Sequence, residues 1–90
     1  MSDLTTDSVP RKPLDVRIRK SKSKFLIARG NEVRDLSPTA ESIWREIDGK
    51  ATVRDISRII AGEFDVELDV VLVDTLELLD GLSDAGLVDY

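Results

Sequence analysis

The amino-acid sequence predicts an α+β domain in which a three-stranded antiparallel sheet is followed by three helices, an arrangement similar to a winged helix. Two patterns in the sequence predict this class. Short runs typical of strands, two of which alternate apolar and charged residues, occupy positions 16–36. From position 38 onward, apolar residues recur three and four positions apart, as they do on one face of a helix. Ninety residues suffice for one such domain with a modest core.

Three strands are expected, at residues 16–19, 25–28 and 32–36. The first and third alternate apolar and charged residues, whereas the second is apolar enough to be the central strand. Between the second and the third, Arg29-Gly30-Asn31 indicates a tight turn, because Gly and Asn tolerate positive φ. The second and third strands should therefore form a hairpin. The third strand leads directly into a helix and is expected at an edge of the sheet.

Three helices are expected after the strands. Ser37-Pro38 is a typical helix start, and Gly49 should end the first helix. Thr52, with Asp55 three positions later, should open the second helix. The third helix should begin near Leu68, run to about residue 85 and stop at Gly86. Its apolar stripe is wide, so this helix is expected to pack on two sides or to leave an apolar strip exposed.

The first residues differ in composition from the rest of the chain. Residues 1–13 are polar and contain Pro10 and Pro13, so we expect a flexible N-terminal arm ahead of a domain at residues 14–90. No apolar run approaches the roughly 20 residues of a membrane span, and residues 1–15 lack the apolar core of a signal peptide. These features predict a cytoplasmic protein.

Residue composition argues against catalysis. The chain has no His and no Cys, which excludes disulfides and thiolate metal sites and removes the usual zinc ligand and general base. The acids Asp65, Glu67, Asp69 and Asp74 lack the spacing of a calcium loop, and acids near a helix N-terminus are explained by the helix dipole. We therefore expect a non-catalytic binding domain with no metal and no cofactor.

Charge is distributed unevenly along the chain and bears on nucleic-acid binding. Residues 1–36 carry nine basic and five acidic groups, whereas residues 37–90 carry four basic and thirteen acidic groups. A winged-helix DNA-binding regulator is one alternative, because the first two helices could form a helix-turn-helix and strands with three helices suggest a winged helix. The second helix offers Arg54 and Arg58, but also Asp55 and Glu63. The acids of the third helix would repel phosphates, and the pI of about 4.6 is far from that of a typical DNA-binding domain. We expect no binding to nucleic acid.

The third strand offers a site for a peptide. An edge strand has unpaired N–H and C=O groups that can pair with an added strand. If the third helix lies beside that edge, its surplus Val and Leu residues would form an apolar wall. The residues alone leave a second possibility open, in which the edge is merely solvated and the whole stripe is core.

A family resemblance favours the peptide site. The sequence resembles the PqqD family over about residues 14–88, at Leu36-Ser37, Ala40, Ile43-Trp44, Asp48-Gly49, Thr52-Val53, Ile56, Asp74, Leu78-Leu79, Leu82 and Gly86-Leu87-Val88. The resemblance implies a peptide chaperone, also called a RiPP recognition element, which binds the leader of a ribosomally made precursor peptide and presents it to a modifying enzyme. That enzyme is a radical SAM protein in pyrroloquinoline quinone biosynthesis, and related domains serve the leader peptidases of lasso-peptide biosynthesis.

By this resemblance, the leader adds as a strand beside the third strand and against the third helix. The implied peptide-binding residues are Glu32, Val33, Arg34, Asp35 and Leu36 on the strand and Leu68, Val71, Leu72, Thr75 and Leu79 on the helix. The resemblance leaves open which of the five helix residues are wall and which are core. Family members often carry Asn at the position of Ser37 and an aromatic residue near the third strand, so leader preference is not implied.

The charges of the strands suggest the kind of leader. Arg34 lies on the third strand, with Arg17, Arg19 and Arg29 nearby in the expected sheet, and these cations predict a leader with acidic residues. A structural subunit of a larger maturation enzyme remains an alternative function. We expect a monomer or a weak dimer, because an open edge permits edge-to-edge pairing.

Overall fold

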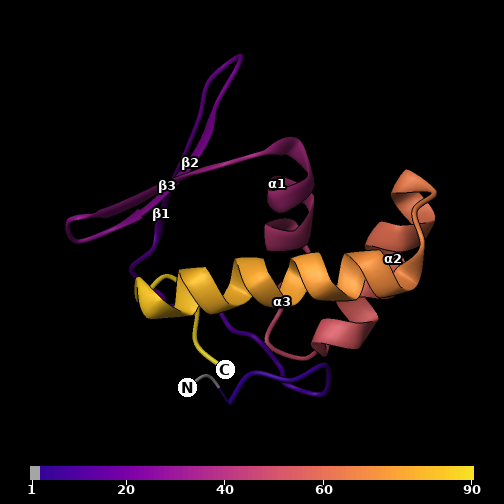
Figure 1. Cartoon of the computed structure of the whole chain (residues 1–90). Coiled ribbons are helices and arrows are strands. Elements are labelled where there is room, and N and C mark those ends of the chain that lie inside the picture. The colour runs from indigo at the N-terminus through magenta and orange to yellow at the C-terminus, as the bar shows by residue number, and fades with distance from the viewer. Residues whose placement is uncertain (1–2) are drawn as a thin grey trace.

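The computed structural model describes residues 3–90 and contains three strands followed by three helices (Figure 1). The strands are β1 (Arg17–Lys20), β2 (Phe25–Arg29) and β3 (Glu32–Leu36), and the helices are α1 (Pro38–Arg45), α2 (Val53–Phe64) and α3 (Leu68–Asp84). The predicted fold class and the predicted order of elements are confirmed. The first two strands differ by one residue from their predicted bounds.

The sheet is antiparallel with the order β1-β2-β3, so β2 is central as predicted and β1 and β3 are its edges. Gly30 has φ +59° in the turn between β2 and β3, which explains the Gly at this position. Phe25, Ile27 and Leu36 are buried on the face of the sheet toward the helices. The opposite face, formed by the alternate residues of each strand, is directed away from the core.

Helix α1 starts as predicted and ends earlier than predicted. The Ser37 side chain accepts the N–H of Ala40, and Pro38 is the first helical residue. The helix ends at Arg45 rather than at Gly49. The cause is local, because the Asp48 carboxylate accepts the N–H groups of Lys50 and Ala51 at 2.8 Å each and holds a turn in place of another helical turn.

Helices α2 and α3 have well-defined ends. Thr52 and Asp55 form a reciprocal capping box at the start of α2. Asp65 ends α2 in the left-handed conformation, with φ 54°. Helix α3 ends at Asp84, and Gly86 follows with φ +75°. The predicted stop at Gly86 is therefore confirmed.

One apolar core joins the sheet to all three helices. Its fully buried side chains include Ile27 from β2, Trp44 from α1, Ile56 from α2 and Leu79 from α3. The C-terminal tail contributes as well, because Leu87 and Val88 are 0% and 1% exposed. A wide stripe on α3 was expected, and the structure divides it: Val70 and Val73 are about half exposed, whereas the other side of the helix is core.

The described part of the N-terminal arm, residues 3–13, lies against the domain. The carbonyl of Ser8 accepts the N–H of Val53, and that of Thr6 accepts the N–H of Arg54, each at 2.9 Å. The amide groups at the start of α2 are thus satisfied by the arm. Further along, Arg11 pairs with Asp89 through two backbone hydrogen bonds of 2.7 and 2.9 Å. Arm residues that were expected to be flexible are therefore in contact with α2 and with the C-terminal tail, and residues 1–2 lie outside the described part of the chain.

Candidate functional site

Strand β3 presents an open backbone edge. Within residues 3–90, β3 pairs only with β2, so its other edge has no neighbouring strand. Four of its five residues are exposed, and only Leu36 is buried. Val33 is 52% exposed and projects from the face of the sheet opposite to the core. This edge has the main-chain groups that strand addition requires.

Arg34 is held by its own strand. Its Nη1 atom lies 3.0 Å from Glu32 Oε2 and donates to the carbonyl oxygen of Val33, also at 3.0 Å. Arg34 therefore already has a counter-ion, and Asp35 adds a second carboxylate to the strand. The predicted basic character of this edge is thus weaker than the residue types suggested.

The ten residues named from the sequence fall into three groups by burial. Leu36, Val71, Thr75 and Leu79 are at most 6% exposed, so these side chains belong to the core. Leu68 and Leu72 are half-buried, and the other four are exposed on β3. Thr75 is fully buried, and its hydroxyl has no hydrogen-bond partner among the described residues. The structure thus shows which of the ten side chains are buried in the core and which are accessible, a division that the sequence left open for the five residues of α3.

The accessible sides of α3 differ in what lies beside them. Leu72 and Leu76 share one side of the helix, and Leu76 lines a small hollow together with Leu4 of the N-terminal arm. Asp74, Leu78 and Ala85 follow helical spacing on the other side of the buried stripe. Figure 1 shows the arm and β3 on different sides of α3. Asp74 and Leu78 were not among the named site residues, although both belong to the resemblance.

The hairpin is anchored at the C-terminal end of α3. Arg29 Nη1 donates to the carbonyl oxygen of Gly86 at 2.8 Å, and Arg29 Nε lies 2.8 Å from Asp15 Oδ1. The hydrogen bond from Arg29 lowers the pKa of Asp15 below its ordinary value. Because β2 continues directly into β3, this anchor fixes the start of β3 relative to the end of α3.

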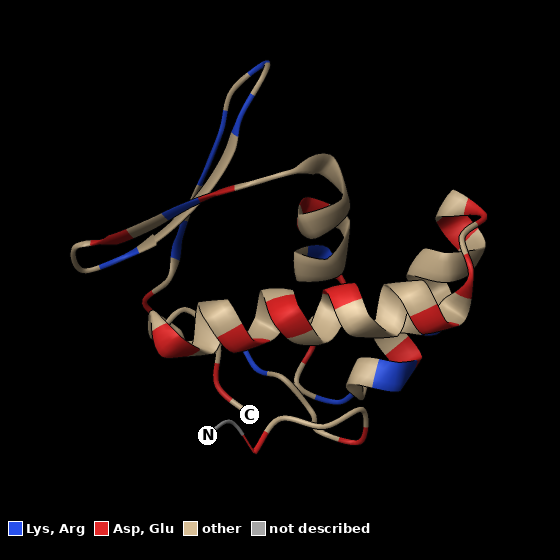
Figure 2. Ribbon diagram, viewed as in Figure 1, with Lys and Arg blue, Asp and Glu red and all other residues tan. Residues whose placement is uncertain are grey.

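Charge separates the two sides of the molecule. In Figure 2, Lys and Arg are concentrated on the sheet, and Asp and Glu recur along α3. Helix α3 has five carboxylates and no basic residue, at Asp69, Asp74, Glu77, Asp80 and Asp84. A helix of this charge would be repelled by a phosphate backbone.

Two further structural features bear on other functions. Over residues 3–90, no group of three or more potential ligand side chains is placed to hold a metal ion. Of the helices in that range, none combines the length and the apolar character needed to cross a membrane.

Comparison with known proteins identifies the family. Residues 25–88 match the family described as coenzyme PQQ synthesis protein D. The chain belongs to the PqqD family. The bifunctional coenzyme PQQ synthesis protein C/D of Methylorubrum extorquens is 28% identical over 83 residues, covering 90% of this PqqD-family chain. Those residues are 22% of the bifunctional protein, so the chain spans about a fifth of that relative's length.

Solved structures of the PqqD family share the fold. The solution structure of the PqqD portion of Methylobacterium extorquens PqqCD has a TM-score of 0.85 and 26% identity, over 97% of this chain and 95% of that one. It is described as a functional, stand-alone RiPP recognition element. The crystal structure of PqqD from Xanthomonas campestris has a TM-score of 0.64 and 22% identity, over 97% and 99% of the two chains, and it shows the fold alone.

Proposed function

We propose that this protein is a non-catalytic RiPP recognition element, which binds the leader of a ribosomally synthesised precursor peptide and delivers it to a modifying enzyme. The open β3 edge is the observation that carries the proposal, in a chain of the PqqD family. The similarity to a stand-alone RiPP recognition element supports it. The partner enzyme would be a radical SAM protein or a leader peptidase, and delivery raises the concentration of the substrate at that enzyme.

Main-chain pairing supplies the affinity in this mechanism. The leader adds as a fourth strand beside residues 32–36, and its N–H and C=O groups pair with those of β3. Because Arg34 covers the Val33 carbonyl oxygen at 3.0 Å, a leader that pairs with this carbonyl displaces the guanidinium group. Alternate leader side chains then project toward the helical side and the outer side of the sheet.

Helix α3 supplies register in the same mechanism. Val71, Thr75 and Leu79 hold the helix in the core, so the contact with the leader falls to half-buried residues beside them. We place that contact at Leu78, because the side of α3 with Leu72 and Leu76 adjoins the N-terminal arm. Leu68 and Leu72 remain the competing candidates on the helix.

The first test examines the backbone pairing directly. A fluorescently labelled leader, taken from short precursor reading frames beside the gene, is titrated into the protein and followed by anisotropy. A series of leaders with single N-methyl amides is then compared. Each N-methyl group removes one donor, so we expect about a tenfold loss of affinity at every second position and little change between them. Equal effects at neighbouring positions would contradict strand addition.

The second test locates the helix wall. Leu78→Ala and Leu72→Ala remove the same number of atoms from half-buried sites on different sides of α3. We expect Leu78→Ala to weaken leader binding and Leu72→Ala to leave it within twofold. The opposite result would place the leader on the side of the arm. Circular dichroism of both variants shows whether they remain folded.

A further inference from the structure

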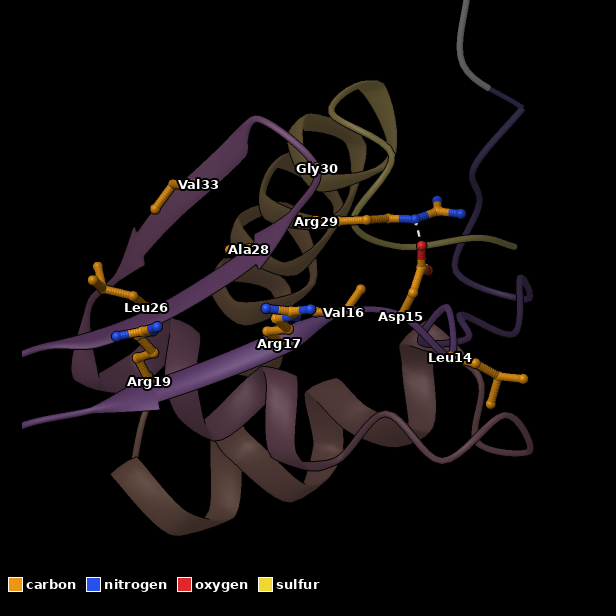
Figure 3. Close-up of a pocket in the computed structure, with 10 residues that line it drawn as sticks. All are labelled: Leu14, Asp15, Val16, Arg17, Arg19, Leu26, Ala28, Arg29, Gly30 and Val33. Atoms are coloured by element: carbon orange, nitrogen blue, oxygen red, sulfur yellow. Dashed lines mark ion pairs between the residues drawn. The ribbon is translucent and has the colours of Figure 1, made fainter.

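The outer face of the sheet contains a second surface, which shares Val33 with the β3 edge and is otherwise outside the proposed leader site. A shallow pocket of about 790 Å³ lies on this face, and residues 14–17 and all three strands contribute to it (Figure 3). The helices pack on the other face of the sheet, where Phe25 and Ile27 are buried. The pocket is therefore separate from the contact proposed for α3.

Two arginines form the basic part of the pocket. Arg17 and Arg19 project from the same face of β1, and Figure 3 shows their guanidinium groups side by side over the sheet. Neither forms an ion pair or a side-chain hydrogen bond with any residue between 3 and 90. The third arginine of the pocket, Arg29, is instead paired with Asp15 at 2.8 Å. Two like charges on neighbouring positions of one face repel each other, and an anion would relieve that repulsion.

The floor of the pocket is apolar. Leu26 and Ala28 of β2 and Val33 of β3 form it, and Val16 lies beside Arg17 in Figure 3. Val33 is 52% exposed, and Leu14 at the rim is fully exposed and points away from the sheet. Exposed apolar side chains next to cations are typical of a surface for a protein partner.

The chemistry of this surface selects one class of occupant. Nucleic acid is disfavoured because the pocket has no aromatic side chain on which a base could stack, and because the chain has a net charge of −5. A second copy could offer the acidic α3, but sheet-on-helix contact is heterologous, so it cannot close as a two-fold dimer and requires a ring or a filament of several copies. An acidic segment of another protein satisfies both the arginines and the apolar floor.

We propose that the outer sheet face is a docking site for an acidic, partly apolar segment of a partner protein. Carboxylates of the segment pair with Arg17 and Arg19, while its apolar side chains cover Leu26, Ala28 and Val33. If the leader adds beside β3, the leader and the partner occupy the edge and the face of one sheet. The partner then contacts the outward side chains of the bound leader.

The test uses a synthetic probe that contains no leader sequence. A labelled peptide of alternating Glu and Leu is titrated into ¹⁵N-labelled full-length protein, and a Lys-Leu peptide of equal length is the comparison. We expect amide shifts at residues 16–19, 26, 28 and 33 with the acidic peptide and none with the basic one. We also expect binding to weaken several-fold between about 50 and 300 mM salt, because screening reduces attraction between exposed charges.

Matched variants separate local from net charge. The double variant with Arg17→Glu and Arg19→Glu should bind the acidic peptide about tenfold more weakly than the wild type. The pair Lys50→Glu and Arg58→Glu changes the net charge equally at exposed sites away from the sheet, and affinity should stay within twofold.

Several results would overturn the docking site. Amide shifts on α3 in place of the sheet face, or equal binding of the basic peptide, would show that the face does not select an acidic segment. Displacement of the acidic peptide by oligothymidylate, or self-association through this face, would indicate a different occupant. A lack of saturation below millimolar peptide would show that no specific site exists. Shifts at residues 16–19 distinguish docking on the face from strand addition at β3, because β1 is the opposite edge of the sheet. Shifts confined to residues 32–36 would therefore also overturn the docking site, whether or not the leader binds at β3.

Discussion

The burial of Thr75 assigns the central residues of the apolar stripe of α3 to the core instead of to the leader site. Its hydroxyl is fully buried and has no hydrogen-bond partner among the described residues. A buried, unpaired hydroxyl costs about 1–3 kcal/mol, so Thr75→Val should raise the free energy of unfolding by about 1 kcal/mol. Urea denaturation measures this change. Leader affinity should be unaltered, since the side chain lies in the core, and a loss of leader binding in a folded variant would return Thr75 to the binding site.

The ion pair between Glu32 and Arg34 affects how strongly β3 can attract an acidic leader. Arg34 Nη1 lies 3.0 Å from Glu32 Oε2, and both side chains are about half exposed, so the ion pair itself contributes little to stability. If the leader is acidic, Glu32→Gln should free the guanidinium group and strengthen leader binding about threefold, whereas Arg34→Glu should weaken it by a similar factor.

A salt series provides the control for that comparison. An acidic leader predicts that the effect of Arg34→Glu shrinks from about 50 to 500 mM salt, because the Debye length falls well below 10 Å. If affinity in both variants is independent of salt, β3 does not recognise leader charge.

At the scale of the element, local signals were the most predictable. The caps at Ser37 and Thr52 use short-range hydrogen bonds, so the sequence placed both helix starts correctly. The end of α1 was missed because the Asp48 turn competes with a further turn of helix, and both fit the same residues. Which residues of α3 are buried and which stay accessible could not be predicted, because the orientation of a helix about its axis depends on what it packs against.

The N-terminal arm shows a similar limit of local reasoning. Its composition indicates flexibility, yet its backbone carbonyls satisfy amides at the start of α2, 45 or more residues away in sequence. Such long-range hydrogen bonds leave no pattern in a single sequence. Pro10 is buried, so the arm also contributes apolar contact. Lys12 Nζ lies 4.9 Å from the centre of the Trp44 ring and adds a cation–π contact.

Removing part of the arm tests this structural role. Deletion of residues 1–9 would expose the Val53 and Arg54 amides and should lower the free energy of unfolding by about 1–3 kcal/mol, at roughly 0.5–1.5 kcal/mol per hydrogen bond. Asp7→Asn is the control, since it removes only the exposed ion pair with Arg54 and should cost under about 1 kcal/mol. Thermal unfolding of the three proteins measures both effects. An unchanged midpoint after deletion would show that the arm is flexible in solution, as the sequence predicted.

At the scale of the whole molecule, the sequence indicated a basic N-terminal half and an acidic C-terminal half. In the fold these two halves lie on different sides of the molecule. The basic half forms the sheet, and α3 carries much of the acidic half (Figure 2). The sequence could not show that Glu32 neutralises Arg34, because that depends on side-chain geometry. Nor could it show that Arg17 and Arg19 are left unpaired among residues 3–90, which moves the basic surface from the β3 edge to the outer face.

The pH dependence of stability also belongs to the whole molecule, since it sums over carboxylates in several elements. Hydrogen bonds from Ala51 and Lys50 lower the pKa of Asp48, those from Thr52 lower the pKa of Asp55, and those from Lys20 and Arg45 lower the pKa of Glu41. Their pKa values are lower in the folded state than in the unfolded state, so the unfolded state binds more protons between the two. The resulting stability is complete above the ordinary values of 3.8 and 4.5 and is lost as pH falls through the folded values.

Urea denaturation between pH 7 and pH 2.5 measures that loss. We expect a nearly constant midpoint down to about pH 5 and a steady fall below it, because the linked protons are taken up only near the carboxylate pKa values. The variant Asp48→Asn with Asp55→Asn should be less stable at pH 7 and should lose less stability on acidification. It keeps the other carboxylates, so it separates the effect of the Asp48 and Asp55 carboxylates from the general repulsion of a positively charged chain. If the wild type and the variant lose stability in parallel, these hydrogen-bonded carboxylates do not control the acid limb.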